Sequence, residues 1–156
     1  MSENNSKLAY TNARLLAVQV LYAHEMGEEN WDKLMSKALL GELGGEVLTE
    51  KEENTIKLPG ADAGLFTRIV ESYREHADEI NEAIKNGLSE KIAFERLEMI
   101  FLCILRAGMA EFYIDSKTDI PIIINEYVDL TRSFFEGTEV KIANAFLDRF
   151  AKIMRG

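Results

Sequence analysis

Cysteine, histidine and proline are scarce in this sequence, which has one Cys, two His and two Pro among 156 residues. The single Cys103 cannot form a disulfide within the chain, and its apolar neighbours in MIFLCIL favour a small core residue over a nucleophile. Neither His24 nor His76 has a cysteine or a second histidine at metal-ligand spacing, so we expect no metal site. These scarcities suit a chain of the reducing cytosol.

Catalytic and membrane-spanning motifs are also missing. GELGG lacks the Lys-Ser/Thr pair and the preceding strand of a phosphate-binding loop, and no Ser, His and Asp are spaced like a triad. The Glu52–Glu53 pair lies in an acidic stretch, where solvated carboxylates are the simpler interpretation. The apolar runs are far shorter than the ~20 residues of a membrane span, and MSENNSKLAY does not resemble a signal peptide. We therefore expect a cytoplasmic protein with no catalytic residues, cofactor or membrane partner.

Negative charge dominates, and the formal net charge is −9. This balance argues against a strong, stand-alone nucleic-acid binder, because phosphate contacts need clustered Lys and Arg. The charges are unevenly distributed, however. Residues 42–54 hold five Glu against one Lys, whereas residues 138–156 hold four basic side chains against two acidic ones. The acidity is thus concentrated away from the C-terminal segment.

Hydrophobic periodicity predicts an all-α fold of about six or seven helices, preceded by a disordered N-terminus at residues 1–6. We expect Asp62 to cap one helix, Asp119 to cap another with Pro121 in its first turn, and Thr138 to cap the last. The segment rich in Phe and Leu that ends near Ile114 is apolar on most sides, which predicts a central buried helix. The expected helices cover residues 7–27, 31–43, 62–86, 90–114, 120–136 and 138–156, with a loop up to residue 59.

The stretch IPIIINEYVDLTRSFFEG could be a buried strand interrupted by polar residues, or a helix. Asn125, Asp129, Arg132 and Glu136 follow one another at the spacing of a single helical face, and a period of two does not fit beyond Asn125. The pattern therefore predicts an amphipathic helix with Asn125 at the start of its polar stripe.

Three segments, which together cover about 60 residues, carry a recognisable pattern. They are ARLLAVQVLYAHE, ERLEMIFLCILRAGMAEF and DIPIIINEYVDLTRSFFEGTEVKIANAFLDRF. The positions that carry it are Arg14, Ala17, Gln19, Leu21 and Tyr22 in the first segment, Leu105, Arg106 and Glu111 in the second, and Asp119, Pro121, Ile124, Asn125, Glu126, Asn144, Leu147 and Asp148 in the third. In these residues and in the order of the segments, the chain resembles the NusB family of bacterial transcription antitermination factors.

The resemblance implies one all-helical domain of two small bundles over residues 7–156, without catalysis or cofactor. It further implies binding to boxA-type RNA of ribosomal RNA leaders, jointly with the ribosomal protein NusE, and action on RNA polymerase elongation complexes. The chain departs from the family in three places. KLAYTNAR replaces an arginine-rich start, the segment before Asn125 is about two residues short, and Ala145 stands where Gly is common. The sparse basic start predicts low RNA affinity for the chain alone.

Family positions that contact RNA map to the starts of the first and last helices, and Arg132 lies one helix away on the polar stripe. The family's contacts there are basic side chains that hold phosphates and an apolar side chain that packs on a base. The alternative is that the basic residues at these positions are ordinary solvated charges. We expect Tyr22 either to face NusE or to pack in the core. Arg106, Glu126 and Asn144 are interpreted as structural, with Glu126 as the acid that pairs with Arg106. The candidate RNA contacts are Lys7, Arg14, Arg132, Thr138, Lys141 and Ile142.

Two other functions fit the pattern. The first is a helical protein-interaction module, or a homodimer, without autonomous RNA binding, in which pairing through the first helix would hide Lys7 and Arg14. The second is the NusB-like domain that precedes the catalytic half of some ribosomal RNA cytosine methyltransferases, which would require a reading frame continuing past Gly156.

Overall fold

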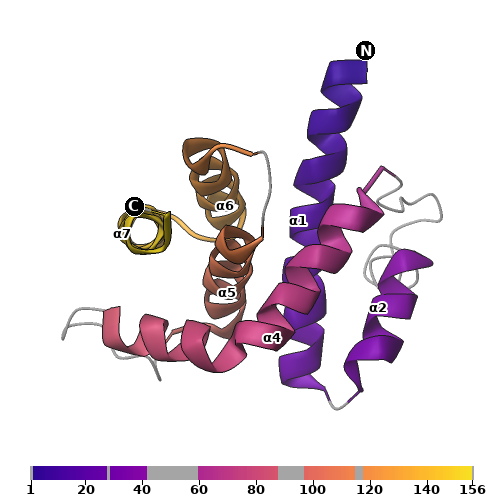
Figure 1. Ribbon diagram of the computed structural model, residues 1–156, viewed down its shortest axis with the longest axis horizontal. Helices are drawn as coiled ribbons and strands as arrows, with labels where there is room; N and C mark the ends of the chain where they lie inside the picture. Colours follow the sequence, from indigo (N-terminus) through magenta and orange to yellow (C-terminus); the bar gives the residue numbers. More distant parts are fainter. Residues whose placement is uncertain (1, 28, 42–59, 88–96, 115–117, 156) are drawn as a thin grey trace. The chain divides into compact units, whose positions relative to one another are not determined.

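The computed structural model describes residues 2–27, 29–41, 60–87, 97–114 and 118–155, and every regular element in these ranges is a helix (Figure 1). The predicted all-α fold is therefore confirmed. The chain divides into two compact units, Met1–Val70 and Glu71–Gly156. The helices are α1 (Ser2–Met26), α2 (Trp31–Leu39), α4 (Ala63–Gly87), α5 (Met99–Tyr113), α6 (Ile120–Phe134) and α7 (Thr138–Arg155).

The first unit is built on α1 and α2, which pack against each other. Helix α1 begins at Ser2, five residues before the helical pattern that the sequence predicts from Lys7, and the expected disorder over residues 1–6 stays a prediction. Asn30 caps α2 by accepting a 2.8 Å hydrogen bond from the Lys33 N–H. Helix α2 ends at Leu39, earlier than predicted, because the chain turns at Gly41 with a φ of 83°. The predicted loop over residues 42–59 lies outside the described residues.

Helix α4 begins in the first unit and continues into the second. The Asp62 carboxylate accepts a 2.8 Å hydrogen bond from the Leu65 N–H, which confirms the predicted cap. The backbone is non-helical at His76, where φ is −114° and ψ is 19°, so the helix is kinked there. The predicted inward stripe is buried apart from the half-buried Ala77, and its buried members are Leu65, Phe66, Ile69, Val70, Tyr73, Ile80 and Ile84.

The core of the second unit forms around α5, which contacts both α6 and α7. All residues of this helix from Phe101 to Phe112 are buried, as its apolar sequence predicted. Gly108 allows a close approach, because a Cβ at that position would lie 3.2 Å from Leu147 Cδ2 and 3.3 Å from Tyr127 Cγ. The predicted start of this helix falls in residues 88–96, outside the described part of the chain.

Helix α6 confirms the helical interpretation of the isoleucine-rich stretch. Asp119 occupies the cap position, but it contributes its backbone carbonyl to the Ile122 and Ile123 N–H groups, and its side chain makes no capping hydrogen bond. Pro121 lies in the first turn, as expected.

Helix α7 starts one position differently from the prediction. Thr138 is its first helical residue rather than its cap, because Gly137 precedes it with a φ of 65° and accepts a 3.2 Å hydrogen bond from the Lys141 N–H. The predicted inward residues Ala143, Phe146, Leu147 and Phe150 are buried, whereas Met154 is half-buried.

Candidate nucleic-acid interface

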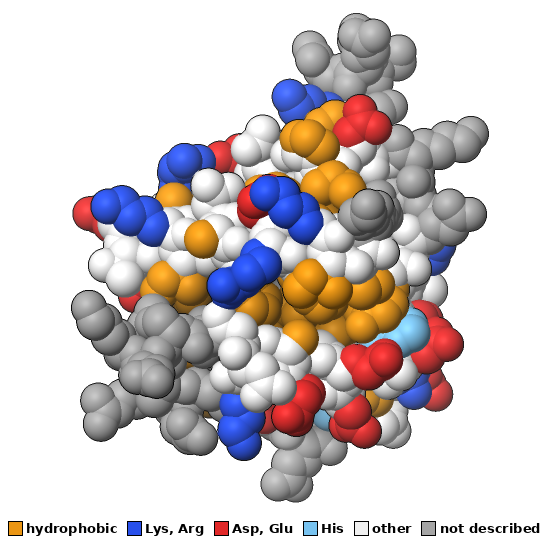
Figure 2. All heavy atoms as spheres, turned by 60° about the vertical axis from the view of Figure 1, so that its left-hand side comes forward, with side chains coloured by type: hydrophobic (Ala, Val, Ile, Leu, Met, Phe, Trp, Pro, Cys, Tyr) orange, Lys and Arg blue, Asp and Glu red, His pale blue; other side chains and the backbone are white. Residues whose placement is uncertain are grey.

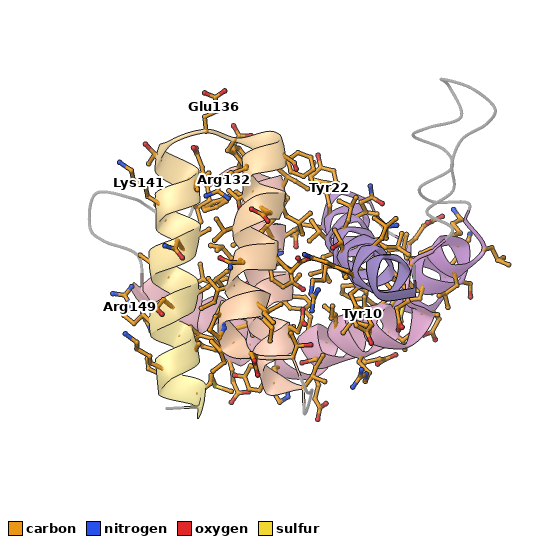
Figure 3. The ribbon with its side chains drawn as sticks, turned by 90° about the horizontal axis from the view of Figure 1, so that it is seen from above. Tyr10, Tyr22, Arg132, Glu136, Lys141 and Arg149 are labelled. Carbon is orange, nitrogen blue, oxygen red and sulfur yellow. The ribbon has the colours of Figure 1, made fainter. Side chains whose placement is uncertain are left out.

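Several of the predicted RNA contacts lie near the turn that joins α6 to α7. Arg132, Thr138 and Lys141 are exposed, and Ile142 is half-buried. Figure 3 shows Arg132 on α6 and Lys141 on α7 at the end of the pair that carries the turn, with Glu136 pointing away from the helices. The arrangement brings two cations, a hydroxyl and an apolar side chain to one end of this helix pair. We call these four residues the α6–α7 turn site.

Both cations of the α6–α7 turn site are available to an anion. Arg132 Nη1 lies 2.7 Å from Asp129 Oδ1, but both side chains are more than half exposed, and such surface pairs contribute about 0–1 kcal/mol. The guanidinium has five N–H donors, so most of them stay free for a phosphate. The Lys141 ammonium forms no ion pair with any residue that the structure describes. The site therefore offers two exposed cations at the end of the α6–α7 pair, beside the exposed carboxylates of Asp129 and Glu136.

The two candidate RNA contacts on α1 differ in exposure. Lys7 is exposed, but the Arg14 side chain is only 2% exposed and is engaged in contacts within the chain. A buried guanidinium cannot offer its donors to a phosphate, so Arg14 is assigned to the interior and the prediction of RNA contact there is corrected. Tyr22 is 37% exposed and Tyr10 is 43% exposed. Figure 3 labels both side chains on α1. The role of Tyr22 in partner binding stays a prediction.

Arg106 is one of the three polar residues interpreted as structural, and it is 7% exposed. Its Nε donates a 2.8 Å hydrogen bond to Asn81 Oδ1, and its guanidinium carbon lies 5.6 Å from the centre of the Tyr73 ring. Asn81 in turn donates to the Tyr73 hydroxyl at 3.0 Å. These contacts tie α5 to α4 and compensate the burial of the charge.

The other two residues interpreted as structural behave differently. Glu126 is half-buried, and its pairing with Arg106 stays a prediction. Asn144 is exposed on α7, and its structural role stays a prediction. A more deeply buried acid is Glu111, which is 0% exposed and accepts a 2.7 Å hydrogen bond from the Tyr127 hydroxyl. The charge of Glu111 within an apolar helix was the signal that could have identified this contact.

Two kinds of site are not found in the described ranges. No group of three or more His, Cys, Asp or Glu side chains there is placed to hold a metal ion. None of the helices in those ranges is both long and apolar enough to span a membrane.

Known proteins match nearly the whole chain. The model of the NusB family matches residues 11–152. A protein of Sinorhizobium fredii named transcription antitermination protein NusB is 35% identical over 144 residues, which cover 92% of this chain and 86% of that protein. A protein of the same name from Sphingopyxis alaskensis is 35% identical over 145 residues, covering 92% of each chain.

Solved structures share the fold. A structure of T. maritima NusB has a TM-score of 0.68 and 22% identity, and the match covers 92% of this chain and 90% of that one. A chain in a structure described as the crystal structure of a plectonemic RNA supercoil has a TM-score of 0.66 and 26% identity, with 92% and 94% covered. Taken with the family match over residues 11–152, these similarities show that the chain belongs to the NusB family.

Proposed function

We propose that this protein is a cytoplasmic transcription antitermination factor that binds boxA-type RNA together with the ribosomal protein NusE and acts on RNA polymerase elongation complexes. The observation that carries the proposal is the α6–α7 turn site, which exposes Arg132 and Lys141 next to a hydroxyl and an apolar side chain. The names of the 35% identical relatives support the antitermination role.

Each residue of the α6–α7 turn site has a chemical role in this proposal. Lys141 and Arg132 neutralise phosphates of the RNA, and the Thr138 hydroxyl donates a hydrogen bond to the sugar-phosphate backbone. Ile142, which is half-buried, offers an apolar edge on which an unstacked base packs. The RNA is held and not chemically altered, so no catalytic residue or cofactor is proposed.

The need for NusE follows from the charge of the chain. The net charge is −9, and α1 contributes Lys7 as its exposed cation at the N-terminal end while Arg14 is buried. Few phosphate contacts give weak, salt-sensitive binding. A second protein that contacts the same RNA adds affinity by making the second contact intramolecular. We assign Tyr22, exposed on α1, to the surface that faces NusE.

A binding titration tests this function. Fluorescence anisotropy of a labelled boxA-type RNA is measured against the chain alone and against the chain with excess NusE. We expect weak binding alone and at least tenfold tighter binding with NusE, and a scrambled RNA should not show that gain. Equal affinity with and without NusE would contradict the proposal.

One feature of α1 favours the alternative of a homodimer. Leu8, Leu15 and Tyr22 recur every seven residues, which is the spacing of a helix-pairing seam, and Leu8 is 56% exposed. Gln19 lies on the same face, and its buried Oε1 has no hydrogen-bond partner among the described residues. Light scattering distinguishes the alternatives, because a homodimer paired through α1 would have twice the mass of 17.7 kDa and would resist dissociation by RNA.

A further inference from the structure

Helix α7 carries basic side chains well beyond the α6–α7 turn site. Lys141, Arg149 and Lys152 are exposed, and their spacing of eight and three residues places them on one face of the helix. The opposite face buries Phe146, Leu147 and other apolar side chains in the core. At 1.5 Å per residue the three cations extend over about 16 Å. We call this exposed line of cations the α7 ridge.

The α7 ridge keeps a net positive charge. Its one exposed carboxylate is Asp148, which lies 3.3 Å from the Lys152 ammonium. The two side chains are 54% and 76% exposed, so solvent screens this pair and Lys152 stays free to exchange partners. Three cations against one carboxylate leave an excess of two positive charges along the ridge.

Another helix of the same unit, α4, carries a cluster of exposed carboxylates. The part of α4 that follows Val70 exposes five carboxylates against the two cations Arg74 and Lys85. The five carboxylates belong to Glu71, Glu75, Asp78, Glu79 and Glu82. In the view of Figure 2, acidic side chains gather at the lower right and basic side chains are spread across the middle. A polyanion is repelled by clustered carboxylates and attracted by clustered cations.

Arg149 is held in place on the α7 ridge. Its Nη2 donates a 2.6 Å hydrogen bond to the carbonyl oxygen of Gly87, the last residue of α4. The C-terminal end of a helix carries a partial negative charge, which the guanidinium offsets. The hydrogen bond uses one of five N–H donors, so the rest can contact a phosphate without further ordering of the side chain.

We propose that the RNA bound at the α6–α7 turn site continues along the α7 ridge, where Arg149 and Lys152 contact two further phosphates. This inference rests on the proposed function and extends the bound segment to nucleotides that flank the boxA-type element. Ala145 lies between Lys141 and Arg149 on the exposed side of α7, so a charge introduced there would lie on the path of the RNA backbone.

Two substitutions test the ridge without touching the Arg149–Gly87 hydrogen bond. Lys152→Gln removes one cation, and Ala145→Glu adds one carboxylate at an exposed position, with Ala145→Gln as its neutral control of equal size. Each variant is titrated, with NusE present, into a short RNA limited to the boxA-type element and into one extended by single-stranded flanks. Lys33→Gln, an exposed lysine of α2, is the control for loss of a charge elsewhere.

We expect the extended RNA to bind wild type more tightly than the short one. Lys152→Gln and Ala145→Glu should each weaken the extended RNA about fivefold at 0.1 M salt, because one phosphate contact of a single strand contributes a slope of about 0.7 in log affinity against log salt. The short RNA, Ala145→Gln and Lys33→Gln should stay within twofold of wild type.

The outcomes separate the ridge from the proposed function. If Lys141→Gln weakens both RNAs while the ridge variants bind like wild type, the α7 ridge is not an RNA track and the proposed function stands. If the ridge variants lose NusE binding in the absence of RNA, the ridge is a protein-binding surface and the inference is overturned. If wild type with NusE binds neither RNA, the proposed function and the inference both fail.

Discussion

Arg149 Nη2 donates a 2.6 Å hydrogen bond to Gly87 O, across 62 residues of sequence. The contact joins the middle of α7 to the C-terminal end of α4. Phe146, one turn before Arg149, packs so closely on Gly87 that a Cβ there would lie 2.5 Å from Phe146 Cε1. Gly87 and Arg149 together allow α7 to pack over the C-terminal end of α4, and these contacts hold the part of the α7 ridge around Arg149 in place.

Gly87→Ala should therefore destabilise the protein by about 1–3 kcal/mol, because the added methyl group overlaps the buried Phe146 ring. Urea denaturation measures the free energy of unfolding. Gly64→Ala in the first turn of the same helix is the matched control, since its Cβ would meet Asp62 Oδ1 at an ordinary 3.4 Å. There the better helix propensity of alanine should raise stability by up to about 1 kcal/mol. Equal changes at the two glycines would contradict the packing argument.

Tyr127→Phe should cost about 1–3 kcal/mol, because it removes the 2.7 Å hydrogen bond that the Tyr127 hydroxyl donates to the fully buried Glu111. The loss leaves an acceptor oxygen of Glu111 without that donor in the core of the second unit. Tyr10→Phe, at a tyrosine that is 43% exposed, should change the free energy of unfolding by less than about 0.5 kcal/mol. A Tyr127→Phe protein as stable as wild type would show that this hydrogen bond contributes little.

Glu126→Gln should lower the melting temperature before it lowers RNA affinity. The expectation rests on the half-buried Glu126 acting as an acid for the nearly buried Arg106, and the loss of its charge should cost about 1–2 kcal/mol. Glu75→Gln, at an exposed position of α4, is the control and should leave melting unchanged. Reduced RNA affinity with wild-type melting would instead place Glu126 in the RNA interface.

Tyr113 makes the folding stability of the protein depend on pH in the alkaline range. Burial, and then the negative charge of Glu79, raises the pKa of the Tyr113 phenol above its usual 10.0. The folded state thus holds this proton more tightly than the unfolded state, and the stability gained is present below pH 10 and lost as pH rises through the folded-state pKa. Tyr113→Phe should reduce the fall in stability above pH 10, as measured by urea midpoints. An unchanged alkaline profile would contradict this assignment.

The sequence was sufficient to locate the helices where side-chain chemistry acts locally. The Asp62 cap, the buried stripe of α4 and the apolar α5 all follow from residue spacing within one segment, and the structure confirms them. The start of α7 was misplaced by one residue. The sequence predicted Thr138 as the cap, but Gly137 precedes the helix with a positive φ, and Thr138 is the first helical residue. The predicted start of α1 at Lys7 falls later than Ser2 because Ser and Asn are weak helix formers, so residues 2–6 carry no helical pattern in the sequence.

The candidate site was less predictable, because burial depends on contacts between segments. Spacing alone could not distinguish the buried Arg14 from the exposed Lys141, because both are basic residues on predicted helices. Asn81, one partner of Arg106, lies 25 residues earlier on another helix and carries no charge that would mark it. The Arg149–Gly87 contact was likewise invisible, since a glycine carbonyl has no side-chain signature.

Photo-crosslinking tests most directly whether RNA lies at the α6–α7 turn site. A boxA-type RNA that carries 4-thiouridine is irradiated with the chain and NusE, and trypsin then releases residues 133–141, which end at Lys141, and residues 142–149. We expect the crosslinks of this chain in these two peptides. In Lys141→Gln trypsin no longer cuts after position 141, and we expect the joined peptide of residues 133–149 to lack the crosslinks. Crosslinks confined to peptides of α2 and α4, and unchanged in Lys141→Gln, would contradict the account.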